Sequence, residues 1–205
     1  TKVQAQAVDI GSISEFKGNA QVYRDKAYGA ELAFPIQQLD NVKTEAGRVA
    51  IRFEDDTVVR VMDHSKLVIN SYIYDPNPKK SEMALRFASG TARFVTGKFN
   101  NKKAIKIQTP SADVFVRGTD FTITTTPETG ASLVILLPDQ YGNASGEIAV
   151  ETAAGQVILN QPYQATTATT YTSAPSKPVT LDITLDLIDN MLIVNPPKER
   201  ENIIA

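Results

Sequence analysis

The sequence predicts an all-β protein in which glycine-punctuated hairpins form a β-roll or a solenoid-like sandwich, with any helix limited to the C-terminal part. The first observation is a repeated pattern of polar and apolar residues in alternation, which follows Gly18, Gly47, Gly90 and Gly146. A period of two is typical of a strand with one buried face. The second observation is turn-forming sequence between these segments, such as the two prolines within residues 75–80. Because the glycines are unequally spaced, we expect a recurring hairpin unit and not an array of fixed period.

Length and composition describe an ordinary folded chain. Its 205 residues suffice for one large or two small domains, and 42% hydrophobic with 21% charged residues argues against disorder. The net charge of -2 gives no general electrostatic reason to bind nucleic acid. The longest purely apolar run, residues 133–137, is far shorter than the roughly 20 residues of a membrane-spanning helix. Since the chain starts at Thr1 and not at methionine, we expect that a leader or a longer precursor has been removed.

The chain divides into three parts. Residues 1–16 alternate weakly and predict an N-terminal arm or an edge strand, and residues 17–164 form the main β domain. Within this domain, residues 54–57 interrupt two alternating segments and predict a hairpin turn. A calcium site is the alternative for the three acids of this turn, although they lack the spacing and the distal glutamate of an EF-hand. The third part is residues 165–205, a Thr- and Pro-rich linker followed by an amphipathic segment.

The main β domain is centred on residues 109–124. Pro110 cannot donate a ladder hydrogen bond, so it marks the entry into a strand. Apolar residues alternate on both sides of Gly118, which predicts two β segments hinged at this glycine. Arg117 and Asp120 flank the bend and are placed to pair across it, fixing a corner of the fold. The whole candidate motif is Thr109, Pro110, Arg117, Gly118, Thr119, Asp120 and Phe121.

Three segments carry a resemblance to a known family. The run TPSADVFVRGTDF at residues 109–121 resembles the signature of the FecR family domain, and GRVAIRFEDDTVVRVMDHSKLVI at residues 47–69 resembles the family's glycine-led hairpin. The run LRFASGTARFVTGK at residues 85–98 resembles the next segment, so the likeness covers roughly residues 10–135. The resemblance implies a stand-alone FecR domain-containing protein. In the best-known members such a domain is the periplasmic sensor part of a regulator that restrains a sigma factor.

The C-terminal segment is a candidate for assembly. Apolar Leu181, Ile183, Leu185 and Leu187 alternate with polar residues, which favours a strand to about Leu187. The same window fits a short helix through Leu181, Leu185, Ile188 and Leu192. After a pliant linker, such a segment folds back onto its own domain or adds a strand to a neighbouring subunit.

The sequence predicts no enzyme: no catalytic residue, no cofactor and no metal site. With no cysteine and one histidine, His64, it lacks Cys-ligated zinc and paired-histidine chemistry. His64 lies between two strands, and we interpret it as a turn residue and not as part of a catalytic triad. Tyr72 and Tyr74 share one strand face and offer a platform for sugar or peptide, although packing is the simpler interpretation. Paired carboxylates for sugar hydrolysis keep a carbohydrate-active protein as the third hypothesis.

Two functional classes remain in competition. The main prediction is an extracytoplasmic structural or assembly module, periplasmic, surface-located or secreted, whose terminal segments join neighbouring subunits in an oligomer, filament, surface or virion assembly. The alternative is a periplasmic sensor domain that binds a transporter's signalling domain or a ligand. Both predict a protein partner: the assembly module self-associates in a homo-oligomer, whereas the sensor stays monomeric and binds an envelope partner. Neither predicts nucleic acid or a membrane span.

Overall fold

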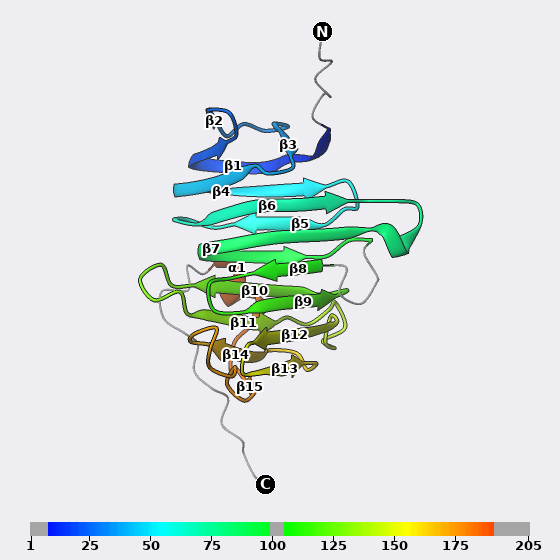
Figure 1. Cartoon of the computed structure of the whole chain (residues 1–205), viewed down its shortest axis with the longest axis vertical. Helices are drawn as coiled ribbons and strands as arrows, with labels where there is room; N and C mark the ends of the chain where they lie inside the picture. The colour runs from blue at the N-terminus through cyan, green and yellow to red at the C-terminus, as the bar shows by residue number, and fades with distance from the viewer. Residues whose placement is uncertain (1–7, 99–104, 191–205) are drawn as a thin grey trace.

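The computed structural model describes residues 8–98 and 105–190, which form a two-layer β sandwich. The strands run across the long axis of the molecule and are stacked along it, from β1 at one end to β13 and β15 at the other (Figure 1). The predicted all-β fold is confirmed. Helical structure is limited, within these residues, to one turn of 3-10 helix at Pro78–Lys80 and to α1, Leu185–Asn190.

Three long strands belong to both layers and join them into one continuous sheet. They are β1 (Asp9–Tyr23), β4 (Asn41–Phe53) and β7 (Glu82–Val95). The first half of β7 pairs with β6 and β8, whereas its second half, from Gly90, pairs with β10 and β5. The chain thus passes from one layer to the other within a strand.

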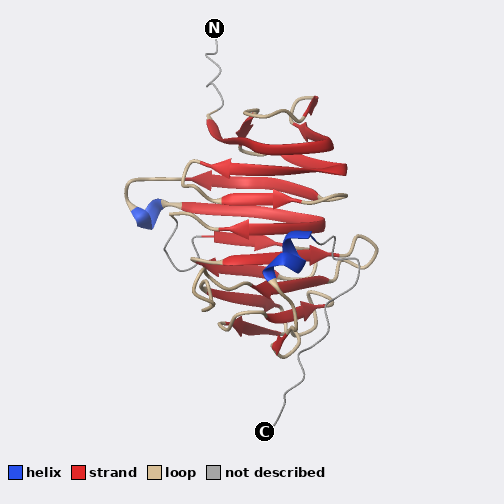
Figure 2. Ribbon diagram, turned by 180° about the vertical axis from the view of Figure 1, so that it is seen from behind, coloured by secondary structure: helices blue, strands red, loops and turns tan. Residues whose placement is uncertain are grey.

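One layer carries α1 on its outer surface, and we call it the helix-side layer (Figure 2). It runs from the first half of β1 through β4, β5, β7, β10, β11 and β14 to β15. Its shorter strands are β5 (Val58–Val61), β10 (Asp120–Thr125), β11 (Ser132–Leu136), β14 (Gln164–Ala168) and β15 (Val179–Thr180).

The opposite layer runs from the second half of β1 to β13. Its order is β1, β4, β6, β7, β8, β9, β12 and β13, in which only the pair of β7 and β8 is parallel. Its shorter strands are β6 (Lys66–Ile73), β8 (Ile105–Gln108), β9 (Asp113–Arg117), β12 (Glu147–Thr152) and β13 (Gly155–Leu159). Short strands β2 (Ala27–Gly29) and β3 (Pro35–Gln37) cover the free edge of β1.

Glycines mark the bends of the long strands. Gly18 and Gly90 have φ values of 74° and 99°, a left-handed conformation that side chains rarely adopt. A Cβ atom on Gly90 would lie 2.0 Å from Ser65 Oγ, so only glycine fits against the loop between β5 and β6. The expectation that these glycines stand at hairpin turns was therefore wrong for Gly18, Gly47 and Gly90, which lie inside strands. A bend within a strand and a turn between strands need the same backbone freedom, so the sequence around the glycine is similar in the two cases.

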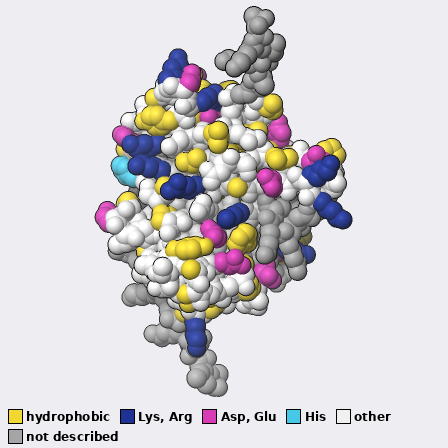
Figure 3. All heavy atoms as spheres, viewed as in Figure 1, with side chains coloured by type: hydrophobic (Ala, Val, Ile, Leu, Met, Phe, Trp, Pro, Cys, Tyr) yellow, Lys and Arg dark blue, Asp and Glu magenta, His cyan; other side chains and the backbone are white. Residues whose placement is uncertain are grey.

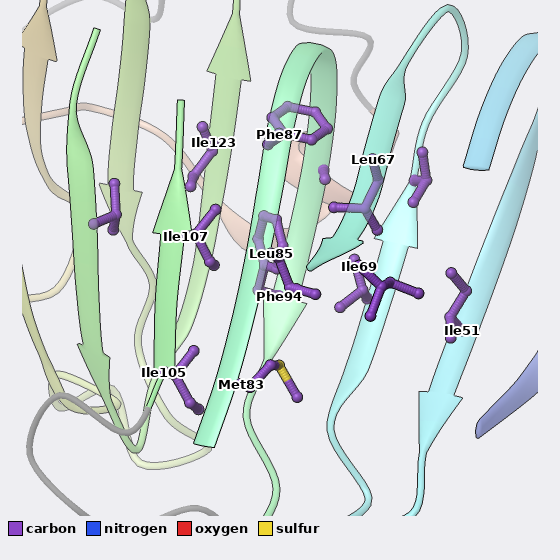
Figure 4. Packing of buried hydrophobic residues seen from close by; sticks show 14 of the residues in the cluster. Ile51, Leu67, Ile69, Met83, Leu85, Phe87, Phe94, Ile105, Ile107 and Ile123 are labelled. Atoms are coloured by element: carbon purple, nitrogen blue, oxygen red, sulfur yellow. The ribbon is translucent and has the colours of Figure 1, made fainter. Parts of the chain in front are cut away.

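The core lies between the layers and receives apolar side chains from both (Figure 4). Phe94 and Phe121 stack with ring centroids 5.0 Å apart, and Phe87 meets Phe94 edge-on at 6.2 Å. These residues come from β7 and β10, the strands at the centre of the sandwich. Aromatic contacts of this kind add to the stabilisation from burial, so the two layers are joined by packing at the centre of the molecule.

The C-terminal part differs from the predicted arrangement. Residues 164–168, at the start of the expected linker, form β14, where the small side chains of Ala165 and Ala168 are buried. The strand expected up to Leu187 is limited to β15, and α1 follows it. Thr184 accepts a hydrogen bond from the Leu187 N–H through its Oγ1 at 3.2 Å and caps the helix. This capping chemistry favours the helical alternative, which alternation alone did not reveal.

Candidate functional site

The motif at residues 109–121 builds a crossing between the two layers. Thr109 Oγ1 accepts hydrogen bonds from the N–H groups of Ser111 and Ala112, at 3.2 and 3.1 Å, and shapes the turn between β8 and β9. Gly118, with φ of 55°, lies between β9 in the opposite layer and β10 in the helix-side layer. The predicted hinge is therefore the point where the chain changes layers.

The ion pair expected between Arg117 and Asp120 does not form. Arg117 stays at the exposed end of β9, whereas Asp120 enters β10 and receives two hydrogen bonds from Arg93. Arg93 Nε lies 3.0 Å from Asp120 Oδ1, and Arg93 Nη2 lies 2.7 Å from Oδ2. Since the change of layers separates residues 117 and 120, the partner of Asp120 comes from the neighbouring strand β7.

The other motif residues serve the packing around this crossing. Phe121 is fully buried in the core, and the Thr119 N–H donates to Thr96 Oγ1 at 2.8 Å. Pro110 lies exposed in the turn that Thr109 caps. The motif thus positions β10, whose outward side chains form part of the helix-side face.

A groove of about 810 Å³ lies on this outer face. Its floor comes from β1, β4, β5, β7 and β10, and Ile188 of α1 lines one side. The strands that line it lie between α1 and the β1 end of the molecule (Figure 2). Five neighbouring strands of a sheet span about 19 Å, so the groove is long enough for a peptide segment.

One cross-strand row describes the whole helix-side face. Directly paired residues on successive strands all point outward, because each pair in register shares a face. The row is Glu15, Ala50, Arg60, Arg93, Thr122, Ile135, Ala165 and Val179. From β1 to β10 it is polar except for the small Ala50, and from β11 to β15 it is apolar.

The apolar half of the face is covered by the chain itself. We call residues 179–190 the strap. Its side chains Leu181, Ile183 and Ile188 are each 5% exposed and pack against Ile135 and Leu137. Backbone pairing holds the strap in place, because β15 pairs with β14 and the Leu181 N–H donates to the Tyr163 carbonyl at 2.9 Å.

The candidate assembly residues therefore have different surroundings. Leu181 and Ile183 are buried within their own chain, and Leu185 packs at the border of the same cluster. Leu187 is 47% exposed. Three of the four alternating side chains contribute to the apolar cluster under the strap, whereas Leu187 faces solvent.

The polar half, which we call the polar groove, contains two arginines that lie directly opposite each other on neighbouring strands. Arg60 and Arg93 are paired residues on β5 and β7, and like charges at such positions destabilise a sheet. Arg93 is neutralised by Asp120. Arg60 reaches only one oxygen of Glu15, at 3.4 Å, and both side chains are about half exposed. The small Ala50 between them allows this contact across β4.

The floor of the polar groove also contains an unpartnered hydroxyl. Thr122 is 3% exposed, and its Oγ1 has no hydrogen-bond partner among the described residues. It stands beside Arg93 in the cross-strand row. Apolar Val58, Val95 and Ile188 complete the lining. The groove thus combines a half-exposed guanidinium, a free hydroxyl and apolar walls.

A buried network anchors the hairpin that carries Arg60. The Tyr72 hydroxyl donates to Asp55 Oδ1 at 2.8 Å and accepts the Asp55 N–H, while the Thr57 hydroxyl donates to Asp55 Oδ2 at 2.5 Å. Burial first, and then the hydrogen bond to Asp55, raise the pKa of the Tyr72 hydroxyl far above its ordinary value. The acids of this predicted turn have separate partners, because Asp56 pairs with Arg52 and Lys98.

The outer face of the opposite layer has a different charge arrangement. Lys43 and Lys66 are paired residues on β4 and β6, whereas Arg86 of β7 pairs with Val68, two residues further along β6. Within residues 8–98 and 105–190, none of the three forms an ion pair. Basic side chains gather on the face shown in Figure 3, which is viewed from this side. The positions of these basic residues, like those of the polar groove, depend on the register between strands that are distant in sequence.

Metal sites and membrane-spanning helices were also sought among the described residues. These residues contain no group of three or more His, Cys, Asp or Glu side chains that could hold a metal ion. Neither helical segment in this part of the chain has the length and hydrophobicity for crossing a bilayer. His64 lies between β5 and β6 with φ of 53°, as its interpretation as a turn residue requires.

Comparison with known proteins gives one family and one fold. The model of the family described as FecR protein matches residues 40–158, which extends beyond the predicted end at residue 135. No curated protein matches the sequence. Two crystal structures of a putative anti-sigma factor from Parabacteroides distasonis have a similar fold, with TM-scores of 0.51 and 0.50. Both are 15% identical to this chain over 66% of its length, and the match spans 57% of theirs.

Proposed function

The chain belongs to the FecR family, and from this membership we propose that it is an extracytoplasmic signalling module that acts by binding another protein. The observation that carries the proposal is the family match over residues 40–158. The fold likeness supports it, because the similar structures are of a putative anti-sigma factor. FecR proteins face the periplasm as signalling components, so the proposed location is extracytoplasmic.

The helix-side face supports binding as the mode of action. It offers an 810 Å³ groove with apolar walls and a half-exposed arginine. Binding sites combine a mainly apolar surface with a few polar groups that fix orientation. The described residues supply no metal cluster for catalysis, and we propose a non-enzymatic role.

The assembly hypothesis stays a prediction. It requires terminal segments that join neighbouring subunits, whereas Leu181 and Ile183 pack on the sheet of their own chain. Residues 1–7 and 191–205, which belong to the predicted arms, lie outside the described residues. We therefore place the sensor function before the structural one.

Deleting the gene in the native bacterium and measuring transcripts tests the proposal. A signalling module predicts a change in one set of genes under a common promoter type, restored by the wild-type chain. Cross-linking in the same cells predicts a different envelope protein as the main partner. Unchanged transcripts, with cross-links only between copies of this chain, would favour the assembly hypothesis instead.

A further inference from the structure

We infer that the polar groove is the docking site for an acidic, apolar-studded segment of the partner protein, whose carboxylate pairs with Arg60. The inference rests on the proposed function, since it names the chemistry of the partner and the surface that receives it. Four observations lead to this partner: the charge state of Arg60, the Thr122 hydroxyl, the apolar walls and the sequence of the strap.

Arg60 supplies the charge that selects the partner. Its contact with Glu15 is long, at 3.4 Å, and joins two half-exposed side chains, so it stabilises the fold little. Arg93, beside it, already donates hydrogen bonds to both carboxylate oxygens of Asp120. An incoming carboxylate therefore gains more from Arg60, where a bidentate contact would also relieve the repulsion from Arg93.

Thr122 and the walls add shape and polarity to the same place. The buried Thr122 hydroxyl has no partner among the described side chains and stands one strand from Arg93. An unsatisfied buried hydroxyl costs stability. Because the oxygen is itself covered, a polar group of a bound segment would satisfy it only when the side chains over Thr122 shift on binding. Val58 and Val95 are paired residues on β5 and β7 and form an apolar strip beside the arginines.

The strap shows that this face accepts such a segment. Its sequence alternates apolar Leu181, Ile183 and Leu185 with Asp182 and Asp186, and it lies on the same outer face as the polar groove. Ile188 belongs both to the strap cluster and to the groove lining. A partner segment of the same type would thus extend the layer that the strap begins, over the half of the face that the strap leaves open.

The length of the groove fits this occupant. From β10 to β1 the floor spans about 19 Å. This distance accommodates about six extended residues or about 13 helical ones. One carboxylate between apolar residues is enough to meet Arg60 while the neighbours contact Val58, Val95 and Ile188.

The test measures binding of a labelled peptide to the full chain by fluorescence anisotropy. The probe is a fluorescein-labelled peptide with the sequence of residues 181–190, Leu-Asp-Ile-Thr-Leu-Asp-Leu-Ile-Asp-Asn. We expect saturable binding that weakens with salt, and an affinity about tenfold lower for the Arg60→Glu chain. The matched control is Arg86→Glu, the same charge change on the opposite layer, which should retain wild-type affinity.

Two further arms make the assignment specific. A peptide in which every Asp is Asn should lose binding to the wild-type chain, and a peptide in which every Asp is Lys should bind Arg60→Glu better than the wild type. Octanoate, a carboxylate with an apolar tail, should compete only weakly. Thermal unfolding of each variant confirms that it is folded.

Several outcomes would overturn the inference. These are no binding to the wild-type chain, equal binding to Arg60→Glu and Arg86→Glu, or tighter binding of octanoate than of the peptide. Self-association abolished by Arg60→Glu would identify the occupant as a second copy and would overturn it too. Because the peptide test needs no native partner, it can succeed when the transcript and cross-linking experiments fail, and the reverse also holds.

Discussion

The two halves of the helix-side face are completed in different ways. In the apolar half, Ile135 and Leu137 are covered by the strap of the same chain, so burial stabilises this region. In the polar half, the ion pair of Arg93 with Asp120 joins β7 and β10, and Tyr72 of the opposite layer holds Asp55 in the hairpin between β4 and β5. The open half carries polar and charged side chains that water can solvate, whereas the covered half needs an apolar partner, which the chain itself supplies.

Removing the strap should have the largest effect. A chain ending at Ser176 loses the burial of Leu181, Ile183 and Ile188. We expect the free energy of unfolding to fall by about 3–6 kcal/mol, since each buried aliphatic side chain contributes about 1.5–3 kcal/mol before the cost of ordering the segment. Urea denaturation measures the loss, and an apolar dye should bind the exposed face.

The matched control for this truncation is a chain ending at Asn190, which keeps the strap. A loss of the same size in both chains would show that the strap is not the cause. Leu187→Ala, which removes an exposed side chain of α1, should change the stability by less than about 0.5 kcal/mol.

Tyr72→Phe tests the network under the polar half and should have a smaller effect. The variant leaves an oxygen and the N–H of buried Asp55 without their partner, which costs about 1–3 kcal/mol at pH 7. The pKa of Tyr72 is raised in the folded state above the ordinary 10.0. The unfolded chain therefore releases this proton first, so the stability contribution is complete below pH 10 and is lost as the pH rises further.

Urea denaturation of wild type and variant between pH 8 and pH 11 checks the sign. Above pH 10 the wild type should lose up to about 1.4 kcal/mol per pH unit more than Tyr72→Phe. Tyr74→Phe, at a side chain that is 43% exposed, should retain the wild-type slope. An identical slope in Tyr72→Phe and wild type would contradict the role of this hydroxyl.

Asp120→Asn tests the ion pair of the polar half. It leaves Arg93 opposite Arg60 without its bidentate partner, and we expect a loss of about 1–2 kcal/mol. Adding Arg60→Ala should recover part of this loss, because it removes the like charge across the strands. A double-mutant cycle by urea denaturation measures the coupling, and strictly additive losses would contradict the contact.

Arg60→Ala alone should have the smallest effect on stability. Its contact with Glu15 is long and half exposed, so we expect a change below about 0.5 kcal/mol. Thermal unfolding and peptide binding measured on the same sample separate the two roles. A loss of stability above about 1 kcal/mol, with unchanged peptide binding, would make Arg60 a structural residue.

Local sequence predicted the fold class and the crossing at Gly118 but not the face built from them. Alternation with period two is readable within one strand, which is why the all-β fold was correct. Arg60, Arg93 and Thr122 meet only through the register of β5, β7 and β10. Their one local signal is that each alternates with buried neighbours and therefore points away from the core. That signal does not say which outward residues become neighbours.

The strap shows a second limit of local reasoning. The alternation of Leu181, Ile183 and Leu185 favours a strand, although the same window also fits a short helix. The contacts with β11 and β14 decide between the two structures. Thr184 before α1 was a readable capping signal. Whether the segment packs on its own chain depends on the outer side of β11. Residues 133–137 are apolar on both faces of this strand.

Light scattering of the full chain and of the chain ending at Ser176 tests whether the strap covers the apolar half of the helix-side face in its own chain. We expect the full chain to be a monomer of 22.3 kDa, because this half of the face is then already covered. The truncated chain should self-associate through the exposed Ile135 and Leu137. A full chain that is an oligomer, together with a truncated chain that is a monomer, would contradict this expectation and would show that the strap joins neighbouring subunits.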